Sequence, residues 1–118
     1  MWLGKRGKSW VMFLCVMAVS LDAFAQQPKE FRITANEFSY KPSTLQVPQG
    51  EVKITVTNRG KFLHGLAIVG RDEKIASIES GETQSLTLKF NKAEQVIFYC
   101  PQPGHRNKRM EGKLSIGR

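Results

Sequence analysis

The segment from residue 98 to residue 117, FYCPQPGHRNKRMEGKLSIG, holds a cysteine, a histidine and a methionine at even spacing. Four residues separate Cys100 from His105, and four more separate His105 from Met110. The first interval contains two prolines and a glycine, which predict a rigid loop that can turn Cys100 and His105 toward one centre. A second histidine, His64, stands far earlier in the chain, shortly after a predicted turn. Side chains of these types bind transition metals.

The first 25 residues are predicted to form a cleavable export signal. They begin with a basic stretch, MWLGKRGKSW, and continue with an apolar run of about a dozen residues, within the ~7–15 typical of a signal peptide. Ala23-Phe24-Ala25 then gives the small-x-small pattern of a cleavage site. A membrane span needs ~20 apolar residues, so this run is too short for one. We therefore expect a periplasmic protein whose mature chain, residues 26–118, is one domain of 93 residues.

Removal of this signal would leave one cysteine, Cys100, one methionine, Met110, and two histidines, His64 and His105. Small exported domains usually depend on disulfides, because a short chain buries little apolar surface. A chain with a single cysteine cannot form an internal disulfide. An unpaired thiol in an oxidising compartment is a liability unless something occupies it, and this favours a metal.

A thiolate, two imidazoles and a weak thioether form the ligand set of a blue-copper site. We therefore predict one type 1 copper ion per chain, bound by His64, Cys100, His105 and Met110. Zinc prefers four firm nitrogen, sulfur or oxygen ligands, and methionine is a poor one. A [2Fe–2S] centre needs more cysteines than the mature chain would contain.

Each of these residue types also has a common role that involves no metal. A lone histidine is often structural, a lone methionine often packs in a core, and a buried cysteine is often inert. A cysteine–histidine nucleophile is the enzyme alternative. It would leave Met110 and one histidine without a role, and FYCPQPGH offers no obvious oxyanion hole.

The mature sequence reads as short strands and turns, without a clear helix. Val52, Ile54 and Val56 alternate with polar residues, which is typical of a strand with one buried face. Similar alternation recurs in SLTLKF, EQVIFYC and GKLSIG, whereas RDEKIASIES is ambiguous between a helical turn and an irregular loop. Short strands separated by turn signals predict an all-β antiparallel sandwich, in which His64 could reach Cys100 from a neighbouring strand end.

The mature chain resembles the cupredoxins, the family that includes plastocyanin, azurin, auracyanin and rusticyanin. The resemblance runs from SYKPSTLQVPQG, through the Asn-x-Gly turn before His64, to YCPQPGHRNKRMEGKLSIG. Its specific part is the Cys-x4-His-x4-Met spacing, which is similar to that of auracyanin and rusticyanin. The resemblance implies a Greek-key β-sandwich or barrel of about seven or eight strands. It also implies that His64, Cys100 and His105 are equatorial ligands and Met110 the axial one. Many members have Asn or Ser after the first histidine, where this chain has Gly65.

A single copper with four protein ligands has no open position for a substrate and carries one electron. We therefore expect an exported electron carrier and not an enzyme. The resemblance implies that His105 reaches the surface through an apolar patch, where it serves as the electron port. The patch would contain Pro101, Pro103 and Phe62 or Leu63. Two alternatives stay open: a component of an iron-uptake system that accepts electrons from ferrous iron, and a copper chaperone or buffer.

Positive charge indicates the kind of partner. The net charge of +8 falls to +6 without the predicted signal, which carries three basic residues and one acidic residue. The run RNKR, Arg106 to Arg109, lies between two predicted ligands and so should border the electron port. This favours an acidic redox partner and salt-sensitive association. A nucleic-acid partner is not expected, because no base-stacking aromatics accompany the basic residues. We expect a monomer.

Overall fold

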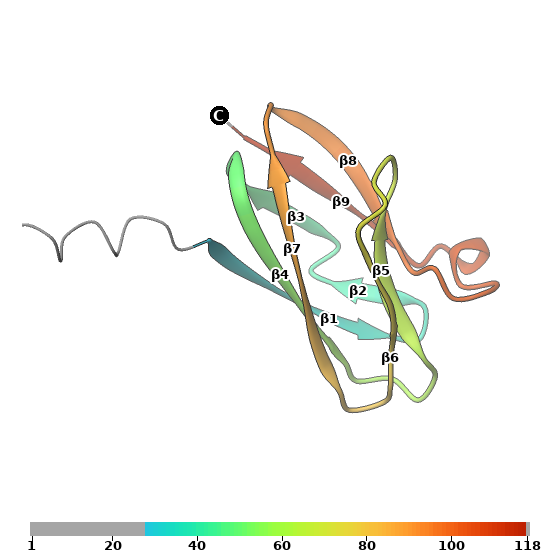
Figure 1. Cartoon of the computed structure of the whole chain (residues 1–118). Coiled ribbons are helices and arrows are strands. Elements are labelled where there is room, and N and C mark those ends of the chain that lie inside the picture. Colours follow the sequence, from blue (N-terminus) through green and yellow to red (C-terminus); the bar gives the residue numbers. More distant parts are fainter. Residues whose placement is uncertain (1–27, 118) are drawn as a thin grey trace, which may run out of the picture.

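The computed structural model of the chain describes residues 28–117, which form nine β-strands in two facing sheets (Figure 1). The strands of sheet 1 are, in spatial order, β2 (Ser39–Lys41), β1 (Lys29–Asn36), β4 (Gly50–Asn58) and β7 (Thr83–Phe90). Those of sheet 2 are β3 (Thr44–Val47), β9 (Glu111–Ile116), β8 (Glu94–Tyr99), β5 (His64–Ile68) and β6 (Lys74–Ile78). The predicted all-β sandwich is confirmed. The predicted export signal lies outside the described residues.

The strand pairing is mixed, which corrects the expectation of a purely antiparallel sandwich. β1 runs parallel to β4, and β3 runs parallel to β9. The chain crosses repeatedly between the sheets, so that each strand of the two parallel pairs lies beside a partner distant in sequence. Alternation along a strand shows which face is buried, but it carries no information on the direction of the neighbouring strand.

Two local features raise the number of strands among residues 28–117 to nine. The opening FRITANEFSY turns at Phe38, whose φ is +74°, and forms the hairpin β1–β2. The ambiguous segment RDEKIASIES contains β6, which pairs with β5. A 3-10 helix (η3, Arg106–Lys108) follows His105. No helix in the described part of the chain is long and apolar enough to cross a membrane.

Apolar side chains that alternate along the strands pack between the sheets, as predicted. Val52, Ile54 and Val56 of β4 are at most 1% exposed. They join Leu66 of β5 and Phe98 of β8 in one buried cluster. Burial of each such side chain contributes about 1.5–3 kcal/mol. This core holds the two sheets together and thereby fixes where the loops at the ends of the strands meet.

One end of the sandwich gathers the segments that carry the predicted ligands. β5 begins at His64, β8 ends at Tyr99 and β9 begins at Glu111. Because β8 runs antiparallel to both β5 and β9, these three strand ends lie at the same edge of sheet 2. The loop that joins β8 to β9, drawn in orange and red, projects from this edge (Figure 1).

Tyr40 of β2 links sheet 1 to sheet 2 near this edge. Its hydroxyl donates a hydrogen bond to the carbonyl oxygen of Gly65 at 2.6 Å. Its ring packs edge-on against Phe98, with 5.1 Å between the ring centroids. Burial, reinforced by the neighbouring Cys100, raises the pKa of the Tyr40 phenol well above its ordinary value. The hydroxyl therefore stays protonated and available as a donor.

We expect Tyr40→Phe to lower the free energy of unfolding by about 1–3 kcal/mol, because the Gly65 carbonyl loses a buried donor. Urea unfolding of the metal-free protein measures this change. Tyr99→Phe is the matched control, since the Tyr99 hydroxyl makes no hydrogen bond within residues 28–117. The control should change stability by less than about 0.5 kcal/mol. Equal losses in the two variants would show that the Tyr40 hydroxyl does not stabilise the contact between the sheets.

Candidate metal centre

Three donor atoms from distant parts of the chain converge at this edge of sheet 2. The Sγ atom of Cys100 lies 3.9 Å from Nδ1 of His64 and 3.4 Å from Nδ1 of His105. The ligand atoms that these three residues offer all lie within 4.8 Å of one another. Such spacing allows all three to contact a single ion.

Backbone hydrogen bonds close the loop between β8 and β9 and return Met110 to the neighbourhood of Cys100. The N–H of Cys100 donates to the carbonyl oxygen of Met110 at 3.1 Å. The N–H of Met110 donates in turn to the carbonyl oxygen of His105 at 3.2 Å. His64 and Met110 are fully buried and Cys100 is 1% exposed, whereas His105 is half-buried. Of the four predicted ligands, His105 is therefore the one that reaches the surface.

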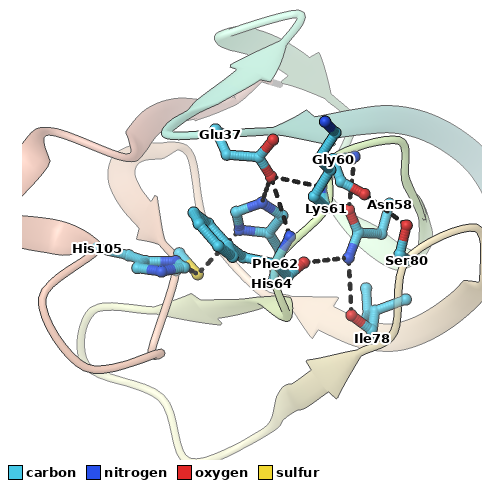
Figure 2. Close-up of polar contacts among 10 residues, drawn as sticks. Glu37, Asn58, Gly60, Lys61, Phe62, His64, Ile78, Ser80 and His105 are labelled. Carbon is cyan, nitrogen blue, oxygen red and sulfur yellow. Dashed lines mark hydrogen bonds and ion pairs between the residues drawn. The ribbon is translucent and has the colours of Figure 1, made fainter.

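The loop before His64 is organised by Asn58, whose side chain is fully buried and hydrogen-bonded at both polar atoms. Its Oδ1 accepts from the N–H of Gly60 at 2.8 Å, which closes a local turn. Its Nδ2 donates to the carbonyl oxygens of Phe62 and Ile78, both at 2.8 Å (Figure 2). The loop is thus tied to the end of β6, and the direction in which the chain enters β5 is fixed.

Comparison with known proteins agrees with this arrangement of sheets and loops. Residues 9–116 match the family model of the cupredoxin-like domain. The chain belongs to the cupredoxin family. Among curated protein sequences, none matches this cupredoxin.

Solved structures share the fold of this cupredoxin at low sequence identity. Auracyanin B aligns with a TM-score of 0.71 and 16% identity over 79% of this chain and 92% of that chain. An azurin from the obligate methylotroph Methylomonas sp. strain J aligns with a TM-score of 0.65 and 18% identity over 78% of this chain and 100% of that chain. The multicopper oxidase mgLAC aligns with a TM-score of 0.61 and 16% identity over 76% of this chain and 39% of that chain.

The converging atoms of this cupredoxin fit a single type 1 copper ion. Cys100 is a free cysteine whose sulfur would bind copper as a soft ligand, and both histidines turn Nδ1 toward this sulfur. A type 1 site combines two imidazoles and a thiolate with a weak axial thioether. No carboxylate belongs to the converging group, so the set lacks the oxygen ligands that calcium or magnesium prefer.

The β1–β2 turn contributes two side chains that contact the histidines and that the sequence patterns did not single out. Oε1 of Glu37 accepts a hydrogen bond from Nε2 of His64 at 3.0 Å (Figure 2). This bond, followed by one from the N–H of Phe62, holds the pKa of Glu37 below its ordinary value, so the carboxylate is charged at neutral pH. The ring of Phe38 packs edge-on against His105, with 5.1 Å between centroids. A turn without glycine or proline gives little sequence signal.

The surroundings of His105 are apolar, in agreement with the expected patch. Phe62 and Leu63 are 55% and 44% exposed, and the ring centroid of Phe62 lies 6.5 Å from that of His105. Pro101 is half-buried and Pro103 exposed in the same loop as His105. Burial, with a smaller contribution from His64, lowers the pKa of His105, which favours the neutral imidazole that a metal requires.

Gly65, the position where many cupredoxins carry a larger polar residue, has no room for a side chain here. A Cβ atom at Gly65 would lie 2.7 Å from the carbonyl oxygen of Ala76 and closer still to that of Ile75. Gln102, in the loop between β8 and β9, connects this loop to β6, because its Nε2 donates to the Ala76 carbonyl oxygen at 2.8 Å. The close approach of β6 therefore explains the glycine.

We expect Gly65→Ala to lower the free energy of unfolding by about 1–3 kcal/mol, because overpacking forces β5 and β6 apart. Thermal unfolding of the metal-free protein measures the loss. Gly117→Ala is the matched control, since a Cβ there would lie 3.9 Å from the Val47 carbonyl oxygen, an ordinary contact. If both variants melt at the wild-type temperature, β5 and β6 do not approach as closely as described.

Proposed function

We propose that this cupredoxin is a mononuclear blue copper protein that carries single electrons between redox partners. His64, Cys100, His105 and Met110 would be the residues that hold the copper ion. The observation that carries the proposal is the convergence of three donor atoms within 4.8 Å in a mostly buried site. Bound copper would supply a one-electron Cu(II)/Cu(I) couple. The chain supplies a fixed arrangement of donors and excludes water from three of them.

Burial of the ligands favours electron transfer over catalysis and over copper delivery. A substrate needs an open coordination position, and His64, Cys100 and Met110 are inaccessible to one. A protein that hands copper on needs ligands that exchange easily at its surface, and the part of the chain described has no further methionine or histidine. A role in iron uptake would use the same centre with ferrous iron as the donor, and no observation favours it.

His105 is the proposed electron port, because it is the ligand at the surface. The rings of Phe38 and Phe62 form an apolar surface beside it, and Leu63, which follows Phe62 in the sequence, is also exposed. Such a surface is easily freed of water when a partner docks, which brings the two redox centres close together.

The charges bordering this surface support an acidic redox partner. Lys108 lies with its Nζ 5.1 Å from the centroid of the Phe38 ring and makes no ion pair within residues 28–117. Arg106 is partly neutralised, since its Nε lies 3.0 Å from a carboxylate oxygen of Glu111. A rim of this kind accelerates encounter with an acidic partner and makes the rate depend on salt. Nucleic acid is not a proposed partner, and the protein is proposed to act as a monomer.

Export completes the proposal. A signal peptide at residues 1–25 would deliver the mature domain, residues 26–118, to the periplasm, and its support is the sequence pattern. No membrane span would remain after cleavage.

We expect the mature domain loaded with Cu(II) to show an intense visible absorption band that disappears on reduction, because the Cys100 thiolate would transfer charge to copper. Cys100→Ser should abolish this band while the circular dichroism of the strands stays unchanged. A colourless wild-type protein, or one that retains zinc in preference to copper, would contradict the proposal.

Small redox reagents test the charged rim without a known partner. We expect Lys108→Glu to slow electron exchange with anionic hexacyanoferrate several-fold at low salt and to speed exchange with a cationic cobalt complex. Stopped-flow absorption at the copper band follows both reactions. Lys92→Glu, in the turn between β7 and β8 at the opposite end of the sandwich, is the matched charge control. If the two variants change the exchange rates equally, the rates depend on the net charge of the protein and not on the charges beside His105.

A further inference from the structure

The turn between β1 and β2 places a carboxylate directly behind one of the two imidazoles. We propose that Glu37 is a positioning residue for the copper centre, which fixes the ring of His64 and makes the oxidised state more stable relative to the reduced state. The inference rests on the proposed function only in taking His64 as a copper ligand. Carboxylates that accept a hydrogen bond from a metal-bound histidine orient the ring and raise its basicity.

A single oxygen of Glu37 accepts three hydrogen bonds. Oε1 accepts from Nε2 of His64 at 3.0 Å, from the N–H of Lys61 at 2.7 Å and from the N–H of Phe62 at 3.2 Å. Figure 2 shows the carboxylate pointing at the His64 ring, on the side of the imidazole away from His105. The three donors hold the carboxylate in one place although its side chain is 31% exposed.

This contact determines which nitrogen of His64 is free to bind a metal. An ionised carboxylate only accepts hydrogen bonds, so Nε2 of His64 must carry the proton. The lone pair of a neutral ring is then on Nδ1, the nitrogen that faces the sulfur of Cys100 at 3.9 Å. Without Glu37, the tautomer with its hydrogen on Nδ1 would also be accessible, and this hydrogen would lie where the metal has to be.

Gly60 provides the space that the carboxylate occupies. A Cβ atom at Gly60 would lie 2.8 Å from the Glu37 carboxyl carbon, closer still to Oε1, and 3.0 Å from Nε2 of His64. Any side chain at this position would displace the carboxylate from the ring. The glycine of the Asn58-Arg59-Gly60 turn therefore has a role beyond the turn itself.

The charge of Glu37 has a predictable effect on the copper couple. A negative charge behind a ligand stabilises the ion of higher charge, and in a partly buried site the effect is weakly screened. Among residues 28–117, no lysine or arginine side chain forms an ion pair with Glu37, whose contact with the neutral His64 ring is a hydrogen bond. Its negative charge therefore acts on the imidazole without compensation by a cationic side chain.

Glu37→Gln is the first test, because glutamine keeps the size and an accepting oxygen but removes the charge. We expect about a tenfold loss in the ratio of Cu(II) to Cu(I) affinity, which is a rise of about 59 mV in the potential of a one-electron couple. Glu79→Gln is the matched control. Its carboxylate is exposed at the same end of the sandwich, and its side chain makes no hydrogen bond or ion pair within the described residues. The control should shift the potential much less.

Gly60→Ala is the second test, since it moves the carboxylate and leaves every charge in place. We expect a rise in potential of the same sign as in Glu37→Gln. Nitrogen-15 NMR of the metal-free proteins gives an independent readout, in which His64 should be in the Nε2–H tautomer in the wild type and in a mixture of tautomers in Gly60→Ala, where the accepting oxygen is displaced.

The outcomes separate this inference from the proposed function. If the wild type binds blue copper but Glu37→Gln keeps the wild-type potential and Gly60→Ala keeps the wild-type tautomer, the positioning role is refuted and the electron carrier stands. If the wild type binds no copper in a blue site, the proposed function fails, whatever the tautomer of His64. Equal potential shifts in Glu37→Gln and Glu79→Gln would also overturn the inference, because the effect would then come from net charge.

Discussion

The pairing of β8 with both β5 and β9 is the constraint on which the rest of the structure depends. Antiparallel pairing brings the start of β5, the end of β8 and the start of β9 to one edge of sheet 2. His64, Cys100 and Met110 occupy or adjoin these three ends. The donor atoms of His64, Cys100 and His105 converge because the apolar core and the strand ladder hold the backbones at these ends, and not because they attract one another. The sandwich therefore prepares the centre before any metal arrives.

The loops at this edge extend beyond the strand ladder, so polar side chains add to the backbone hydrogen bonds that close the loop between β8 and β9. Asn58 serves the loop before His64, Gln102 serves the loop after Cys100, and Glu37 joins the first of these loops to the β1–β2 turn. Every buried side-chain nitrogen or oxygen in the described part of the chain has a partner. Buried polar groups are costly when unbonded, so this network favours one conformation of each loop. A rigid centre suits electron transfer, since little has to move when the charge changes.

Sequence reasoning predicted the features that repeat or that carry unusual side chains. Alternation along β4 and β8 identified the buried faces, and Cys100, His105 and Met110 were identified by type and spacing. The direction of strand pairing was not predictable, because the residues of one strand do not show whether its neighbour runs parallel or antiparallel to it. The β1–β2 turn was missed because a phenylalanine at φ +74° is rare and no glycine marks it. Glu37 was missed for a different reason: its importance comes from a contact with a residue 27 positions away.

The two imidazoles differ in environment. An electron carrier needs a suitable reduction potential and a suitable rate of encounter with its partner, and the two environments affect these properties separately. His64 is fully buried and hydrogen-bonded to a carboxylate, so its surroundings favour the more positive metal ion. His105 lies against apolar rings at the surface, with Lys108 beyond them, so in the proposed carrier its surroundings would favour the less positive ion and the proposed acidic partner. Solvent screens the exposed ammonium more than the carboxylate held against the ring. The reduction potential should therefore depend mainly on the groups around His64. The rate of encounter with a partner should depend mainly on the groups around His105. Each property can then change with little effect on the other.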